Sequence, residues 1–195
     1  MTKTIFYGLA LIAASAFGSV SQASSLLVFN SSGAPIKAGG GPNATQYWAS
    51  CQGDNCMQGI HGTQSAPIFS SESVTGFNIG PASEANELSF LNNLLATSSL
   101  SQPPVTFVQK TDVAGNSFTT NREYFSIKQQ TWTAYFKNTS GGEITIDFGP
   151  NSWSHFTEYG NEVAPVPLPA AAWLFGSALL GLVGVGYRRK RARSA

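Results

Sequence analysis

The sequence has 195 residues, enough for one globular domain, and only 11% of them are charged. The formal net charge of +1 hides an uneven distribution. All ten acidic residues lie between positions 54 and 162, and the segment 24–163 that contains them has only five Lys or Arg residues, so its net charge is −5. This composition excludes the basic surface on which nucleic-acid binding depends.

The first 23 residues have the pattern of a secretory signal peptide. A short and weakly basic start, residues 1–4, precedes the apolar stretch 5–17. Ser21-Gln22-Ala23 then provides the small residues that a signal peptidase recognises. We predict cleavage after Ala23, which leaves residues 24–163 as an exported β-rich domain.

The exported segment begins with a predicted strand at residues 25–29, ended by an Asn-Ser-Ser-Gly turn. Residues 37–65 are rich in Gly, Asn and Gln, and they predict a long irregular loop. The run Gly39-Gly40-Gly41 lacks the spacing and the strand-to-helix setting of a phosphate-binding loop. No cofactor is expected from it.

The two cysteines of the chain, Cys51 and Cys56, lie inside this predicted loop. In an oxidising compartment they are expected to form a local disulfide across a Gly-Asp-Asn turn. So small a closed loop stabilises a domain by about 2 kcal/mol. A zinc site is the alternative, but it would need a matching pair of Cys or His ligands.

A single helix is predicted in the middle of the exported segment. Residues 73–79 alternate as a strand, and the period then changes at residues 82–95. There Leu88, Leu91 and Leu95 recur at helical spacing behind Pro81. Acidic residues in a first helical turn complement the helix dipole, and this is the role that we expect for Glu84 and Glu87 rather than metal ligation.

The remaining elements are predicted to be strands. Their ranges are 105–110, 117–120, 123–129, 132–137, 143–148 and 153–159. The segments 132–137 and 143–148 alternate most clearly, and the turn Asn138-Thr139-Ser140-Gly141-Gly142 between them predicts a β-hairpin. Short strands, frequent turns and one helix indicate a mainly β fold, an antiparallel β-sandwich.

The last 32 residues, 164–195, have three parts. A Pro-rich lead-in comes first, an uncharged apolar run at residues 170–187 follows, and a basic tail ends the chain. The apolar run gives roughly 27 Å of helix, enough to cross a bilayer as a single transmembrane helix. Cationic residues stay on the cytoplasmic side, so we expect the tail inside and the exported domain outside. The tail residues are Arg188, Arg189, Lys190, Arg191 and Arg193.

The run VPLPAAAWLFGSALLGL at residues 166–182, with the basic cluster behind it, closely resembles the PEP-CTERM sorting signal of Gram-negative bacteria. In that family an exosortase, a membrane-embedded cysteine peptidase, reads the signal. The name-giving Pro-Glu-Pro is replaced here by Val-Pro-Leu-Pro, which resembles a known subtype and leaves the cleavage point open. The residues that carry the resemblance are Val166, Pro167, Leu168, Pro169, Ala170, Ala171, Trp173 and Leu174. An ordinary membrane anchor is the alternative.

A weaker resemblance links the exported segment to one group of PEP-CTERM surface proteins. The segments 83–92, 125–128, 133–138 and 154–160 carry it. Those domains are taken to be β-sandwiches without an established biochemical activity. The resemblance implies a fold and a surface location, and no catalysis.

Catalytic and metal-binding patterns are sparse. His61 and His155 are the only histidines, and no Gly-x-Ser-x-Gly elbow is present. A group of Asp147, Ser154 and His155, or a metal site of Asp147, His155 and Glu158, can be drawn, but no spacing rule favours either. We therefore expect a protein that is not an enzyme, with a secreted hydrolase as the less favoured alternative.

Aromatic residues are numerous for a small exported domain. Exposed Trp and Tyr side chains would suit a carbohydrate-binding module, whereas buried ones would fill a core. The residues in question are Tyr47, Trp48, Trp132, Tyr135, Trp153 and Tyr159. The sequence thus predicts an exported cell-surface or matrix protein. Its expected partners are an exosortase, the inner membrane before processing, and extracellular polysaccharide.

Overall fold

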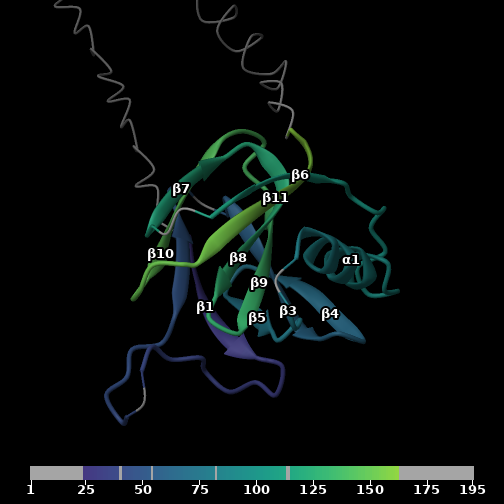
Figure 1. The fold of residues 1–195 in the computed structure, drawn as a ribbon. Coiled ribbons are helices and arrows are strands. Elements are labelled where there is room, and N and C mark those ends of the chain that lie inside the picture. Colours follow the sequence, from purple (N-terminus) through teal and green to yellow (C-terminus); the bar gives the residue numbers. More distant parts are fainter. Residues whose placement is uncertain (1–23, 40, 54, 82, 113–114, 163–195) are drawn as a thin grey trace, which may run out of the picture.

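The computed structural model describes residues 24–39, 41–53, 55–81, 83–112 and 115–162. These residues form eleven strands and one helix, α1 (Glu84–Leu95), as Figure 1 shows. The prediction of a mainly β domain with one helix is confirmed. The strands are β1 (Ser24–Asn30), β2 (Trp48–Cys51), β3 (Met57–Thr63), β4 (Ala66–Ser70), β5 (Ser73–Phe77), β6 (Phe107–Thr111), β7 (Ser117–Thr120), β8 (Arg122–Gln129), β9 (Trp132–Asn138), β10 (Ile144–Gly149) and β11 (His155–Glu162).

The strands belong to one hydrogen-bonded, curled sheet rather than to the two separate sheets of a sandwich. Its order is β6-β11-β8-β9-β5-β1-β2-β10-β7, and β3 branches from β9 and carries β4. The sheet is also not fully antiparallel, because β1 and β5 pair in parallel from Leu27↔Ser73 to Asn30↔Gly76. Three strands intervene between β1 and β5 in the chain, which provides the long crossover that parallel pairing requires.

The sheet forks along one edge of β9. Thr133 and Ala134 pair with β5, whereas residues 136–138 pair with β3. At the fork, β3 passes so close to β5 that a Cβ on Gly59 would lie 2.5 Å from the Cβ of Val74. Because glycine has no Cβ, β3 and β5 can approach closely enough for both to pair with β9.

The curl brings the two ends of the strand order together. The ring of Phe118 on β7 stacks on Phe156 of β11, with centroids 4.1 Å apart. The hydroxyl of Thr120 donates a hydrogen bond to the carboxylate of Glu158. The inner face of the sheet therefore encloses the larger of two hydrophobic cores, which includes Leu26, Val28, Tyr47, Phe125, Ile127, Trp132, Phe136, Ile146 and Phe148.

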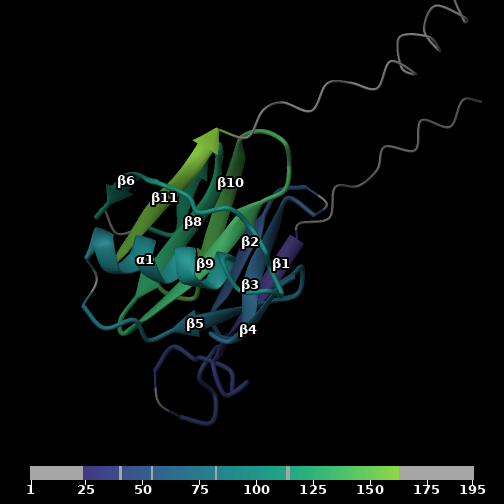
Figure 2. The same cartoon turned by 90° about the vertical axis from the view of Figure 1, so that its right-hand side faces the viewer.

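α1 covers the outer face of the sheet and creates a second core there, as Figure 2 shows. Its buried residues Leu91, Leu94 and Leu95 belong to one cluster with Tyr124, Tyr135 and Tyr159, which come from β8, β9 and β11. These central strands are consequently buried on both faces. The helix starts as expected, since the side chain of Ser83 accepts a hydrogen bond from the Asn86 N–H at 3.2 Å.

Two local predictions are wrong, and one strand was missed. Residues 37–65 contain β2 and β3 rather than only an irregular loop, and β4 was not predicted. The hairpin of segments 132–137 and 143–148 does not form either. β9 pairs with β8, β5 and β3, whereas β10 pairs with β2 and β7. Alternation correctly marked both segments as strands, but it says nothing about which strand becomes the neighbour.

The predicted disulfide is present. Cys51 ends β2 and Cys56 precedes β3, and the bond joins them with their Cα atoms 6.2 Å apart. β2 pairs with β1 and β10, whereas β3 pairs with β4 and β9. The bridge thus connects two parts of the curled sheet that share no direct pairing.

The predicted targeting segments lie outside the described residues. These are the signal peptide 1–23 with its cleavage site at Ala23, the Pro-rich motif, the spanning segment 170–187 and the basic tail. Within the described part of the chain, no helix combines the length and apolarity needed to cross a membrane.

Candidate functional site

The most concentrated polar chemistry lies between α1 and β11. Successive side chains of a strand point to opposite faces, so His155, Thr157 and Tyr159 share the face that is turned to the helix. All three are buried, with 6%, 0% and 0% of their surface exposed. Phe156 and Glu158 occupy the inner face instead, where Phe156 packs in the larger core and Glu158 contacts Thr120.

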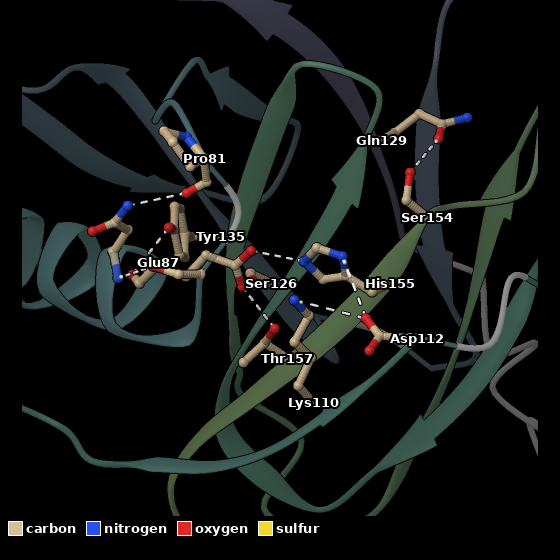
Figure 3. A network of polar contacts seen from close by, with 12 residues as sticks. Pro81, Glu87, Lys110, Asp112, Ser126, Gln129, Tyr135, Ser154, His155 and Thr157 are labelled. Atoms are coloured by element: carbon tan, nitrogen blue, oxygen red, sulfur yellow. Dashed lines mark hydrogen bonds and ion pairs between the residues drawn. The ribbon is translucent and has the colours of Figure 1, made fainter.

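Glu87 of α1 is the centre of this cluster and is fully buried. Its Oε1 lies 2.7 Å from Nε2 of His155, and its Oε2 accepts a hydrogen bond of 2.7 Å from the Thr157 hydroxyl. The Tyr159 hydroxyl lies 3.4 Å from the same Oε2. Figure 3 shows the carboxylate between the His155 ring and Thr157.

Tyrosines complete the surroundings of Glu87. The Tyr135 hydroxyl donates to the backbone carbonyl oxygen of Glu87 at 3.1 Å, and the Tyr159 hydroxyl lies 3.1 Å from Oγ of Ser126. Burial raises the pKa of both phenols above its usual value, with the Glu87 charge as a further cause. Both tyrosines therefore remain neutral and can donate hydrogen bonds.

Glu87 itself is ionised at neutral pH. Burial alone would raise its pKa, but the hydrogen bonds from His155 and Thr157 and the electrostatic interactions with His155 and Lys110 lower the pKa below the ordinary value of 4.5. An ionised carboxylate only accepts hydrogen bonds, so Nε2 of His155 must carry the hydrogen that it shares with Glu87.

Charged residues at the rim connect the cluster to solvent. Nδ1 of His155 lies 3.8 Å from Asp112, whose side chain is 77% exposed, and Asp112 also lies 3.7 Å from the Lys110 ammonium. Lys128 of β8, whose partner on the neighbouring strand β11 is His155, is only 6% exposed. Burial lowers the pKa of Lys128, the Glu87 carboxylate opposes this shift, and Lys110 adds to it.

This arrangement joins α1 to the sheet. Both ring nitrogens of His155 face carboxylates, whereas a general base needs a nitrogen directed at its reactant. The Ser154 hydroxyl donates its hydrogen bond to Oε1 of Gln129 at 3.4 Å rather than to His155. Figure 3 shows the Ser154–Gln129 pair above the His155 ring. The combination of Asp147, Ser154 and His155 drawn from the sequence is therefore not assembled.

The metal site drawn from the sequence is not assembled either. His155 and Glu158 point to opposite faces of β11, and Asp147 belongs to β10. No group of three or more His, Cys, Asp or Glu side chains in the described ranges is arranged to hold a metal ion. Glu84, the other acid of the first helical turn, is exposed, in agreement with the dipole interpretation.

The aromatic residues considered for sugar binding are mostly core residues. Tyr47, Tyr135 and Tyr159 are 0% exposed, and Trp132 and Trp153 are 5% and 2% exposed. Trp48 is the partly exposed member of the set. Five of the six therefore present no face to a ligand at the surface.

Glu87 is the residue that the sequence interpretation missed. Its position in the first helical turn is compatible with the dipole role, so the local sequence does not distinguish it from an exposed acid such as Glu84. A usable signal did exist in residues 155–159, where His, Thr and Tyr alternate with Phe and Glu. Such a strand is polar toward one side, yet it has to be buried if a helix covers it.

Comparison with known proteins adds no assignment, because no family model, curated protein or solved structure matches this chain.

Proposed function

We propose that this chain is an exported bacterial surface protein with a non-catalytic domain, sorted by an exosortase through residues 164–195. The observation that carries the proposal is the order of three features at this end of the chain: Pro-rich lead-in, uncharged apolar run and basic tail. The described strands lie within residues 24–162, between the two proposed targeting segments.

Two features of the domain support this proposal. A Cys51–Cys56 disulfide agrees with folding in an oxidising compartment outside the cytoplasm. The buried groups around His155 are already engaged with one another, which favours a structural role for them. After export the protein would remain in the inner membrane until processing and would then pass to the cell surface or the extracellular matrix.

The test replaces residues Val166 to Pro169 with alanine in the full chain. Proline fixes φ and biases its predecessor toward extended backbone, the form that a peptidase binds. The variant should still insert, because the apolar run is untouched, but it should not mature. Intact mass of the product from cells with and without an exosortase gives the result.

A control replaces Asn161, Glu162 and Val163, the three residues before the lead-in that starts at position 164, with alanine and should mature normally. An ordinary anchor would show no exosortase-dependent mass change in any version. Maturation of the Val166–Pro169 variant at the normal rate would refute the sorting motif and leave only a membrane anchor.

A further inference from the structure

The outward face of β1 is apolar where a half-buried strand would normally be polar. Leu26 and Val28 point into the core, whereas Leu27 is 41% exposed and Phe29 is partly exposed on the opposite face. The rings of Phe29 and of His61 from β3 pack at an interplanar angle of 77°, with centroids 5.9 Å apart. β1, β3 and β5 lie together in the lower part of Figure 1.

These side chains line an open groove of about 330 Å³. Its lining residues are Leu27, Phe29, Gly33, His61, Glu72 and Ser73. The groove combines an apolar wall with polar groups at its rim, which is the usual composition of a small-ligand site. Its position differs from that of the polar cluster under α1.

The polar groups of the groove are positioned by the strands behind them. Nδ1 of His61 lies 3.3 Å from the Thr75 hydroxyl, which also accepts a 2.9 Å hydrogen bond from the Gly62 N–H. This contact engages Nδ1 of the His61 ring, so a ligand would interact with the other ring nitrogen, Nε2. Ser73 is held by Ser70, with the two hydroxyl oxygens 3.1 Å apart.

The charge of the groove restricts its ligand. Glu72, which is exposed, is the one acidic residue in the lining, and no Lys or Arg contributes. An anionic ligand would meet this carboxylate in a domain whose net charge is −5 over residues 24–163. A neutral ligand rich in hydroxyl donors is compatible with Glu72 as an acceptor.

We propose that the groove binds one neutral sugar residue of a polysaccharide. A pyranose ring has an apolar C–H face, which fits Leu27 and Phe29, and an edge of hydroxyls, which fits Glu72, Ser73 and His61. Because the groove is open rather than enclosed, the neighbouring sugars of a chain can remain in solvent. The inference rests on the proposed function in one respect, the extracellular location at which the domain would meet a polysaccharide.

The test uses the full chain in phospholipid nanodiscs and titrates cellobiose, maltose and lactose by ligand-observed NMR, with cyclohexanol as an apolar comparator. At least one disaccharide should bind saturably with a Kd of about 1 mM or lower. Glu72→Gln should weaken binding about fivefold, and Leu27→Ser about tenfold. Glu143→Gln, an exposed acid elsewhere, should leave binding unchanged.

Both test positions are exposed, so the variants should keep their fold, which circular dichroism verifies. Absence of saturable disaccharide binding would overturn the proposal, as would equal affinity in the Glu72→Gln and Leu27→Ser variants. Cyclohexanol binding as tight as that of every sugar would do so too, because it would reveal a merely apolar patch. The two proposals can fail separately, because the titration does not require processing by an exosortase. Sugar binding can be present when maturation is not observed, and maturation can be observed when sugar binding is absent.

Discussion

Glu87 is a charge placed where it is usually avoided, at a helix–sheet interface without exposure to solvent. Such a residue is tolerated only when its desolvation is offset, here by the donors of His155 and Thr157 at 2.7 Å each. Removal of one partner would leave the other buried without a match, which costs more than the pair contributes on its own. The cluster therefore favours one position of α1 on the sheet over sliding alternatives.

We predict that Glu87→Gln lowers the free energy of unfolding by about 2 kcal/mol at neutral pH. An amide has one acceptor oxygen and one donor group, so either His155 or Thr157 loses its acceptor. Denaturant unfolding at pH 7 measures the change. The control Glu84→Gln, in the same helical turn but exposed, should change stability by no more than about 0.5 kcal/mol.

The same variant has a pH signature. The folded pKa of Glu87 lies below 4.5, so its stabilisation is fully present above that pH and is lost as the pH falls through the folded value. The Glu87→Gln domain should lack this part of the acid dependence. If both proteins lost stability in parallel on acidification, folding would not lower the pKa of Glu87.

At the scale of elements, local patterns predicted strands well and partners poorly. The alternation of Ile144, Ile146 and Phe148 is real, and these residues do point into the core. Yet the turn between β9 and β10 does not close a hairpin, because β9 is already paired on both edges. Partner choice depends on the fit of the whole curled sheet, which no single segment encodes.

The strands hidden in residues 37–65 show the same limit from the other side. β3 reads Met-Gln-Gly-Ile-His-Gly-Thr, and its two glycines argue for a loop when the segment is considered alone. In the structure Gly59 is required because the Ser73 carbonyl oxygen would lie 2.8 Å from an added Cβ. A glycine selected for close approach is indistinguishable in the sequence from a glycine selected for flexibility.

We predict that Gly59→Ala destabilises the domain by about 2 kcal/mol, since an overpacked core must shift backbone or side chains. The nearest atoms, on Val74, Ser73 and Leu26, belong to buried strands and cannot move independently. Thermal unfolding compares it with Gly142→Ala, where an added Cβ meets nothing within 4 Å. Equal stability of the two variants would mean that β3 and β5 do not approach as described at the fork.

At the scale of the whole molecule, the domain carries the fold, whereas the proposed targeting segments carry the evidence for location. The structure describes the fold of residues within 24–162, while the proposed location rests on residues 1–23 and 164–195. The location was predicted from local patterns, and so was the Cys51–Cys56 disulfide, whose cysteines are only five positions apart. A location signal is a local pattern, whereas a contact such as Glu87–His155 spans 68 residues.

We predict that the chain crosses the membrane with its basic tail inside and its domain outside. A reporter fused after Glu162 should be active outside the cytoplasm, and one fused after Ala195 should be active inside. The physical reason is that Lys and Arg behind an apolar span remain on the cytoplasmic side, while the signal peptide starts the export of the domain. Alkaline phosphatase, which requires an oxidising compartment, and a fluorescent protein that folds in the cytoplasm provide the two readouts.

The basic tail can be tested separately from the apolar run. Replacement of its five cations with glutamine should reduce retention of the fusion after Ala195 in the cytoplasm, because the run at residues 170–187 would keep its hydrophobic length but lose its orienting charge. The replaced residues are Arg188, Arg189, Lys190, Arg191 and Arg193. As a control, substitution of Lys37 with glutamine should leave both reporters unchanged, since that charge is far from residues 170–187 in the sequence. A cytoplasmic signal from the fusion after Glu162 would contradict export of the domain, and with it the compartment in which Cys51 and Cys56 are expected to join.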